Sequence, residues 1–371
     1  MEFTVSKATL QRELAFTQGV IERKTTIPIL ANLLIEAENG VVRLTATDLE
    51  LGIHCTFPAK VETEGSGTLP AKRLLDYVRL LPDEDIKIKF LENQWASITC
   101  GRSRTRIAGM SKDSFPELPS VPATSIKISA SRLRGMITQT LFAISTEETR
   151  FTLNGALLVL QPDSMKMVAT DGHRLAHVVA DFPVEGITEP VTALLPRKAM
   201  GELLKLTDAL ADDTVLAFAA DDNHLFFQTD ERLLITRKLS GSFPDYARVL
   251  PKEQTYEVVL PKDEIRSALE RVAQFSDERS RAVKMALNEG VLKVYSSITD
   301  TGDSEETMPA DYHGELVDIG FNAQYLLEFM RAVAGDEVRF CFRDSQSAAE
   351  FQPSNDDTTL HYRYVVMPMR I

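Results

Sequence analysis

The residues in this sequence best suited to chemistry are Asp171 and His173, a carboxylate and an imidazole separated only by Gly172. A carboxylate beside an imidazole could serve general acid–base catalysis in a hydrolase. Such an enzyme also needs an activated nucleophile, and the chain contains no G-x-S-x-G elbow. It also lacks a P-loop, a G-x-G-x-x-G turn and an H-E-x-x-H helix. We therefore expect no catalytic residues and no enzymatic activity.

The other histidines and the cysteines do not indicate a metal site. The remaining histidines, which are His54, His177, His224, His313 and His361, are scattered without the spacing of metal ligands. Cys55, Cys100 and Cys341 are few, odd in number and far apart, and no CxxC pair occurs. We expect all three to be buried small apolar residues, and we predict neither a metal nor a cofactor.

Length and composition are typical of a globular protein of two or three ordinary domains, since 44% of the 371 residues are hydrophobic. No apolar run approaches the roughly 18 residues of a membrane helix, and the N-terminus does not resemble a secretion signal. We expect a cytoplasmic protein without a membrane partner. The net charge of −13 argues against nucleic acid binding unless positive side chains gather on one surface.

An internal repeat with a period of roughly 125 residues organises the chain. A helix, an acidic turn and an alternating strand follow one another in 69–90, in 195–218 and in 321–342. In the first of these, Leu74, Leu75 and Val78 recur at helical spacing, and 86–90 alternates between apolar and charged residues. An earlier unit, a short strand leading into an amphipathic helix, recurs in 3–14, 126–141 and 258–272.

The segments after these earlier helices have the character of half-buried antiparallel strands. They span 33–44, 156–168 and 283–294, with turns at Asn39-Gly40, Pro162-Asp163 and Asn288-Glu289-Gly290. The sequence therefore predicts an α+β protein of three tandem similar domains, each an antiparallel sheet layer with two helices on one face. Proline-rich polar segments at 116–123 and 251–254 place the domains at 1–122, 123–252 and 253–371. Three duplicated domains that form no ring remain an alternative.

Positive charge gathers on the predicted helices of this acidic chain. Lys198 and Lys205 are seven residues apart and share a helix face, as do Lys262 and Arg266 at i and i+4. Further cations on these helices are Lys72, Arg73, Arg79 and Arg197. If the helices cover one side of their sheets, these residues form a cationic surface whose field differs in sign from the net charge. The alternative is that they are ordinary solvated helix faces.

A second charge asymmetry separates the two ends of the chain. Arg102, Arg104 and Arg106 alternate along one face of a predicted strand in the first domain, whereas the third domain carries Glu305 and Glu306. Unpaired sheet edges are liabilities unless they are paired or charged. Head-to-tail pairing of a basic edge with an acidic edge, repeated twice, closes a two-fold ring. As an alternative, both segments are exposed hairpins that charge keeps soluble.

Four motifs carry a family resemblance, namely 28–33 (PILANL), 169–175 (ATDGHRL), 243–246 (FPDY) and 365–371 (VVMPMRI). Through them the chain resembles, along essentially its whole length, the bacterial DNA polymerase III beta subunit, the replicative sliding clamp. The resemblance implies the DNA-clamp fold, in which one chain forms half of a ring. The ring is then a head-to-tail homodimer of six like domains, with twelve helices lining the hole and a continuous outer layer of sheet.

The same resemblance implies a processivity factor that slides on double-stranded DNA without sequence specificity. Its expected partners are the DNA polymerase III alpha subunit, the clamp loader complex, and other DNA polymerases and repair proteins with clamp-binding peptides. A rival class is a ring or arc scaffold that binds partner peptides without encircling DNA, which the acidic balance would suit. Retention on circular DNA that is lost on linear DNA distinguishes the two.

By motif match, the resemblance implies a peptide cleft between the second and third domains. Its residues are Leu153, Thr170, Gly172, His173, Leu175, Pro244, Arg248, Val249, Asn322, Tyr325, Val365, Met367, Pro368, Met369 and Arg370. Methionine suits a shared docking site because its flexible thioether adapts to different side chains. The alternative for the terminal Met-Pro-Met is an ordinary last strand in a core.

The resemblance also points to residues that contact DNA, which are Lys24, Arg73, Arg150, Arg197 and Lys198. Together with the charged edges, formed by Arg102, Arg104, Arg106, Glu305 and Glu306, they complete the predicted sites. The segment 344–363 departs from the family by a polar insertion at 353–357. No site residue is assigned to that segment.

Overall fold

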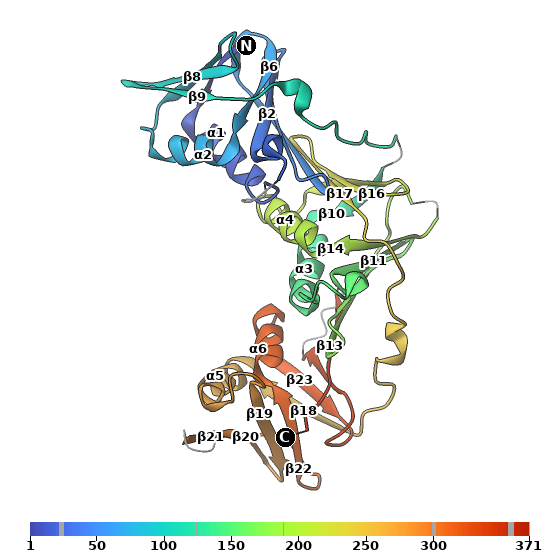
Figure 1. Ribbon diagram of the computed structural model, residues 1–371. Helices are drawn as coiled ribbons and strands as arrows, with labels where there is room; N and C mark the ends of the chain where they lie inside the picture. The colour runs from blue at the N-terminus through green and yellow to red at the C-terminus, as the bar shows by residue number, and fades with distance from the viewer. Residues whose placement is uncertain (22–25, 124, 188, 299–301, 355–359, 371) are drawn as a thin grey trace. The chain divides into compact units, whose positions relative to one another are not determined.

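The computed structural model describes residues 1–21, 26–123, 125–187, 189–298, 302–354 and 360–370 (Figure 1). These residues form two compact units. Unit 1 consists of 1–134 and 198–238, and unit 2 consists of 135–197 and 239–371. Each unit therefore contains part of the segment 123–252 that the sequence assigns to the central domain.

The described elements follow one another as six repeats of the order βαβββ. Repeats 1 to 3 are β1 (Glu2–Ser6), α1 (Lys7–Thr17), β2 (Asn32–Glu38), β3 (Val41–Thr47), β4 (Leu51–Pro58); β6 (Gly65–Pro70), α2 (Ala71–Leu80), β7 (Asp85–Phe90), β8 (Trp95–Cys100), β9 (Ser103–Ala108); and β10 (Ile126–Ser129), α3 (Ala130–Thr140), β11 (Gly155–Gln161), β12 (Ser164–Thr170), β13 (Arg174–Asp181). The short strand β5 (Lys60–Thr63) is an addition between repeats 1 and 2.

Repeats 4 to 6 are β14 (Val191–Pro196), α4 (Arg197–Asp208), β15 (Val215–Ala220), β16 (His224–Gln228), β17 (Arg232–Arg237); β18 (Tyr256–Pro261), α5 (Lys262–Val272), β19 (Ala282–Asn288), β20 (Val291–Ile298), β21 (Gly302–Pro309); and β22 (Val317–Asn322), α6 (Ala323–Ala332), β23 (Glu337–Phe342), β24 (Ala349–Pro353), β25 (His361–Val366). Short 3-10 helices, including η4 (Phe151–Leu153) and η5 (Tyr246–Arg248), lie in the connections.

Four antiparallel sheets hold these strands. Unit 1 contains the orders β5-β1-β7-β8-β9 and β10-β15-β16-β17-β4-β3-β2-β6, and unit 2 contains β14-β11-β12-β13-β25-β24-β23-β18 and β21-β20-β19-β22. The last strands of four repeats pair in twos. β17 pairs with β4 from Arg232 opposite Cys55 to Thr236 opposite Leu51. β13 pairs with β25 from Arg174 opposite Val366 to Val179 opposite His361.

Local sequence accounts for these elements. The apolar residues of α2 predicted to share a face, Leu74, Leu75 and Val78, are fully buried. The following strand β7 buries Ile86 and Ile88 and exposes Lys87 and Lys89, as its period of two predicts. Between β2 and β3, Asn39 and Gly40 have φ angles of 51° and 77°, the left-handed pair that a two-residue hairpin turn needs. The predicted α+β class with antiparallel sheets is confirmed.

The cores lie between the helices and their sheets. In unit 1, α1 lies beside α2 and contacts β3 and β4, and in unit 2 α5 lies beside α6 and contacts β20 and β21 (Figure 1). The core of unit 2 is rich in aromatic rings, such as Phe340 and Phe351, which stack at 4.6 Å between ring centres. The three cysteines are free and buried, which confirms the prediction for them. None of the described helices is long and apolar enough to cross a membrane.

Candidate functional site

A pocket of about 170 Å³ lies in unit 2, where strands of repeats 3 and 6 meet. It is bordered by the end of β12, the loop 171–173, the start of β13, the segment 244–249 and the end of β25. The residues that line it are Leu153, Thr170, Gly172, His173, Arg174, Leu175, Pro244, Tyr246, Val249, Val365 and Met367. Most of these side chains are apolar, so the pocket suits an apolar side chain of a ligand.

Nine of the predicted cleft residues line this pocket, namely Leu153, Thr170, Gly172, His173, Leu175, Pro244, Val249, Val365 and Met367. The sequence prediction omitted Arg174 and Tyr246, which also line it. Both stand inside the motifs that carried the family resemblance, at the sixth position of ATDGHRL and the last of FPDY. The motifs therefore held the signal, although a buried arginine in an apolar pocket is not an obvious candidate.

The other predicted cleft residues lie outside the lining of this pocket. Arg248 is exposed and pairs with Asp245 at 2.7 Å. Asn322 caps α6, because its side-chain oxygen accepts a hydrogen bond from the Gln324 amide at 2.9 Å. The remaining ones are Tyr325 on α6 and the terminal residues Pro368, Met369 and Arg370.

The terminal Met-Pro-Met segment is not an ordinary core strand. Strand β25 ends at Val366, and Met367 is 46% exposed. The Met367 amide donates to the carbonyl oxygen of His173 at 2.9 Å, and the Met369 amide donates to that of Gly320 at 2.8 Å. These two bonds hold the segment along the pocket, where the Met367 side chain stays accessible. The alternative of a last strand packed into a core is therefore wrong.

The loop from Thr170 to Arg174 forms one wall and is fixed by its own hydrogen bonds. The Asp171 Oδ1 atom accepts from the amides of His173 at 2.9 Å and Arg174 at 3.1 Å. The Thr170 hydroxyl donates to the Arg174 carbonyl oxygen at 2.6 Å and accepts from the Gly172 amide at 3.1 Å. Gly172 has a φ angle of +89°, which favours glycine.

This arrangement explains why Asp171 and His173 are not a catalytic pair. The Asp171 carboxylate is occupied by amides of its own loop and by Arg174. The His173 ring is exposed, and its Nδ1 lies 4.0 Å from the carboxylate, too far for a hydrogen bond. The two residues build the pocket wall instead.

Arg174 is the one charged residue in the lining of this pocket, and its side chain is only 8% exposed. Its Nε donates to Asp171 Oδ2 at 2.9 Å, its Nη2 donates to the carbonyl oxygen of Phe142 at 2.6 Å, and its Nη1 pairs with Glu328. The guanidinium also lies 4.3 Å from the ring centre of Tyr325. A buried charge needs such partners, because an unpaired one is costly.

The floor of the pocket is a small apolar cluster. Val168, Leu175 and Val365 are buried together, and partly buried side chains packed against them are Leu157, Phe243, Tyr246, Leu250 and Ala348. A peptide side chain entering the pocket would lose contact with water against this cluster, which favours binding by roughly 1.5–3 kcal/mol for a buried leucine or phenylalanine. The pocket can therefore dock short apolar motifs.

The predicted DNA contacts have different surroundings. Arg73 is exposed on α2 and lines, with Lys72 and Lys205, a hollow of about 830 Å³ in unit 1. Lys198, also in unit 1, pairs with Asp48 and donates to the carbonyl oxygen of Val20 at 3.2 Å. Lys24 lies outside the described residues.

Two further predicted DNA contacts, both in unit 2, donate to backbone carbonyl oxygens. Arg197 donates to Ile144 at 2.9 Å. Arg150 donates to Asp171 at 2.7 Å and pairs with Glu147 at 2.8 Å. The hydrogen bonds of these two arginines support loops, and both residues are only partly exposed.

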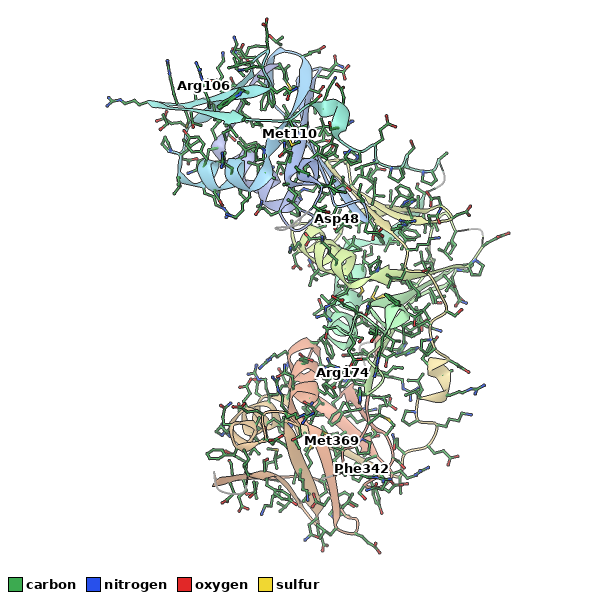
Figure 2. The ribbon with its side chains drawn as sticks, in the orientation of Figure 1. Asp48, Arg106, Met110, Arg174, Phe342 and Met369 are labelled. Carbon is green, nitrogen blue, oxygen red and sulfur yellow. The ribbon has the colours of Figure 1, made fainter. Side chains whose placement is uncertain are left out.

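The two predicted charged edges lie on edge strands of their sheets, β9 in unit 1 and β21 in unit 2. Arg102, Arg104 and Arg106 are exposed (Figure 2 labels Arg106). Glu305 is exposed on β21 and pairs with Lys293. Glu306 points to the other face of the strand, where Arg271 binds it at 2.5 Å and 2.9 Å and lowers its pKa.

The repeated fold and a pocket for apolar motifs define a binding protein. Three family models match the chain: the N-terminal domain of the DNA polymerase III beta subunit over 1–119, its central domain over 127–245 and its C-terminal domain over 247–370. The chain belongs to this family, the bacterial sliding clamps, and is a non-catalytic processivity factor of DNA replication. The predicted boundaries at 122 and 252 stay predictions.

Individual relatives agree over their full length. The beta sliding clamp of Pseudomonas aeruginosa is 33% identical and that of Caulobacter vibrioides is 34% identical, with 100% of both chains covered. The crystal structure of the Pseudomonas aeruginosa DNA polymerase sliding clamp has a TM-score of 0.91 at 32% identity, and 100% of each chain is covered. A sliding clamp from Bartonella birtlesii bound to griselimycin has a TM-score of 0.93 at 35% identity, with the same coverage.

Proposed function

We propose that two copies of this chain pair head to tail through β9 and β21 and close a ring around duplex DNA. The observation that carries this proposal is the pairing of the last strands of the repeats. Repeats 1 and 4 pair through β4 and β17, and repeats 3 and 6 pair through β13 and β25. The last strands of repeats 2 and 5, β9 and β21, lie at sheet edges in the described part of the chain.

A third pairing of the same kind, between β9 and β21, would close a symmetric ring if the two strands belong to different copies of the chain. In each observed pairing, an eight-stranded sheet forms from two sets of four strands. Each set comes from two consecutive repeats, either 1 and 2, 3 and 4, or 5 and 6. Joining β9 to the β21 of a second copy would likewise join two sheets into one, here of nine strands because β5 is an addition to the first sheet. A two-fold axis would repeat the contact at the other side. Covering both edges also removes two sites for unwanted strand addition.

The charges of the two edges favour this partner choice. Arg104 and Arg106 lie on β9, and Arg102 lies in the turn before it. Asp303 and Glu305 are exposed on β21, while Glu306 lies on its other face. Exposed ion pairs contribute only about 0.2–1 kcal/mol each, so charge selects the partner and steers the encounter. Backbone hydrogen bonds and apolar burial along the strands supply most of the stability.

DNA then passes along the helices without sequence-specific contacts. The exposed cations Arg73, Lys72 and Lys205 offer phosphate contacts, and Lys24, Arg150, Arg197 and Lys198 are the further proposed ones. Because a closed ring retains DNA by topology, loose contacts suffice. The net charge of −13 disfavours other modes of DNA binding.

The pocket in unit 2 is the proposed docking site for partner peptides. We propose that it binds peptides of the DNA polymerase III alpha subunit, of the clamp loader complex, and of other DNA polymerases and repair proteins of the cytoplasm. Arg248, Asn322, Tyr325, Pro368, Met369 and Arg370 form its proposed rim. A polymerase joined to the ring cannot diffuse away, so its effective concentration at the primer end stays high. Because relatives bind griselimycin, we propose that the same pocket binds it here.

The test is retention of labelled protein on nicked circular plasmid during gel filtration, after loading by a clamp loader and ATP. The expected result is retention on circles that is lost when the plasmid is cut. No retention on either form with a competent loader would favour a scaffold that does not encircle DNA. Equal retention on both forms would mean ordinary DNA binding.

A further inference from the structure

Two buried arginines occupy the same place in the two strand pairings that join the repeats. Arg232 is the first residue of β17, which pairs with β4, and Arg174 is the first residue of β13, which pairs with β25. Their side chains are 6% and 8% exposed. Each reaches a carboxylate on a helix of the repeat that supplies the neighbouring strand.

In unit 1, the Arg232 cluster consists of Arg232, Glu13 and Phe16. The guanidinium donates to the two carboxylate oxygens of Glu13 at 3.1 Å and 2.9 Å. It lies 3.6 Å from the ring centre of Phe16, one helical turn along α1. None of these three residues lines the pocket of unit 2, so the cluster allows a matched comparison.

In unit 2, the Arg174 cluster consists of Arg174, Glu328, Tyr325 and Asp171. Glu328 and Tyr325 are one turn apart on α6, as Glu13 and Phe16 are on α1. The difference is that Arg174 also lines the pocket and holds the Asp171 carboxylate, whose other oxygen fixes the loop of Gly172 and His173.

The repeats single out Glu328. Asp76, Glu202 and Glu328 stand at intervals of 126 residues, at the same position of α2, α4 and α6. Asp76 pairs with Lys72 at 2.8 Å and Glu202 pairs with Lys205 at 2.7 Å, both within their own helices. Glu328 instead takes Arg174 from β13. The carboxylate at this position pairs within its own helix in α2 and α4. In α6 it pairs with Arg174, which holds the pocket loop.

We infer that Glu328 is a positioning residue of the peptide pocket, acting through Arg174 on the Asp171–His173 loop; this inference rests on the proposed docking function of that pocket. Glu328 does not line the pocket itself. Its carboxylate holds one end of the guanidinium, and the side-chain amide of Gln324 donates to that carboxylate at 2.9 Å. Without Glu328, the guanidinium keeps Asp171 and the Phe142 carbonyl as hydrogen-bond acceptors and can shift within the wall.

The test compares Glu328→Gln with Glu13→Gln, which removes the charge that Arg232 contacts in the equivalent cluster and that also accepts from Arg12 at 2.6 Å. Griselimycin affinity of the full-length protein is measured by titration calorimetry, and thermal stability is measured in parallel. We expect Glu328→Gln to weaken griselimycin binding roughly tenfold, because a neutral amide with one acceptor oxygen holds the Arg174 guanidinium in the wall less firmly than a carboxylate does. Glu13→Gln should lower the melting temperature and leave the affinity unchanged. If the role of Glu328 were merely structural, Glu328→Gln would likewise leave the affinity unchanged.

A conservative variant keeps the inference testable if Glu328→Gln does not fold. Glu328→Asp retains the charge but shortens the reach to Arg174, so its affinity should fall between those of wild type and Glu328→Gln. Wild-type affinity in Glu328→Gln, or in Glu328→Asp where only that variant folds, would overturn the inference. An equal loss of affinity in Glu13→Gln would overturn it as well. If the wild-type protein does not bind griselimycin, the docking assignment fails first.

Discussion

The guanidinium of Arg150 donates a hydrogen bond to the carbonyl oxygen of Asp171 at 2.7 Å. A residue proposed to contact DNA thus supports the loop that forms one wall of the peptide pocket. The contact is possible because Gly172 has no side chain. A Cβ atom at that position would stand 2.9 Å from the Nη1 atom of Arg150.

Replacing Gly172 with alanine should therefore have two effects. The φ angle of +89° should lower the free energy of unfolding by about 1 kcal/mol. The added Cβ should displace Arg150 and shift the loop, so griselimycin affinity should drop several-fold. Chemical denaturation and calorimetric titration measure the two quantities separately.

Gly290→Ala is the matched control. Gly290 has a φ angle of +76° in the β19–β20 turn, and nothing lies within 4 Å of the position of its Cβ atom. It should show the loss of stability with wild-type affinity for griselimycin. The same affinity in Gly172→Ala and Gly290→Ala would contradict a role for the Gly172–Arg150 contact.

Met367 provides the adaptable side of the pocket, and its truncation should impair docking. Met367→Ala removes an apolar side chain that is 46% exposed without a ligand, so it should weaken griselimycin binding about tenfold. Deletion of the last five residues should abolish binding, because it also removes the hydrogen bonds to His173 and Gly320. Sedimentation should show an intact dimer in both variants.

Met110→Ala controls for the loss of an exposed methionine. Met110 is 36% exposed in unit 1 and belongs to neither the pocket nor the charged strands. Its replacement should leave griselimycin affinity unchanged. Unaltered affinity in Met367→Ala, measured by the same titration, would refute the assignment of the pocket.

Charge reversal at Arg104 should weaken the proposed pairing of β9 with β21. Arg104 is exposed on β9, and a glutamate there would face the acidic strand of the second copy. The lost attraction of about 0.2–1 kcal/mol becomes a repulsion of similar size, and the ring contains two such contacts. Sedimentation at low concentration and low salt should show dissociation that high salt reduces.

Arg248→Glu is the control for this change, since Arg248 is also exposed but lies far along the chain from either edge strand, in η5. The single tryptophan, Trp95, offers a second measurement. It is 41% exposed on β8, where it pairs with Ala108 of β9. Its fluorescence should change on dilution in the wild-type protein. A dimer of Arg104→Glu as stable as wild type would exclude Arg104 from the interface.

The sequence predicted the repeat, the helix faces and the turns because these depend on local patterns. Leu74, Leu75 and Val78 are buried as helical spacing requires, and Asn39-Gly40 forms the turn that its residue types favour. It also predicted most of the pocket lining, since the motifs hold those residues.

The surroundings of the charged residues could not be predicted in the same way. Arg174 meets Glu328 across 154 positions of the chain, and Lys198 meets Asp48 across 150. Such pairs depend on how strands from distant repeats align, and no periodicity within one segment encodes that alignment. For this reason the sequence-based prediction gave Lys198 no acidic partner and did not place Arg174 in the pocket.

Two half-buried histidines should make the protein sensitive to acid. Burial, reinforced by the nearby Lys166 and Arg363, lowers the pKa of His177 from 6.5 to about 4, and burial with Arg43 lowers that of His54 to about 4. Between about pH 6.5 and pH 4, these two histidines are therefore protonated in the unfolded chain and neutral in the folded chain. Stability should be complete above about pH 6.5 and decline as the pH falls towards 4, by up to roughly 3 kcal/mol for each histidine.

Denaturant titrations between pH 4 and pH 7.5 measure this slope. His177→Gln, which stays neutral throughout, should flatten the pH dependence, because the unfolded state of this variant gains no proton at that position. His313→Gln, at a side chain that is 75% exposed, is the control for the substitution itself. A slope in His177→Gln identical to that of the wild type would show that His177 titrates alike in the folded and unfolded chains.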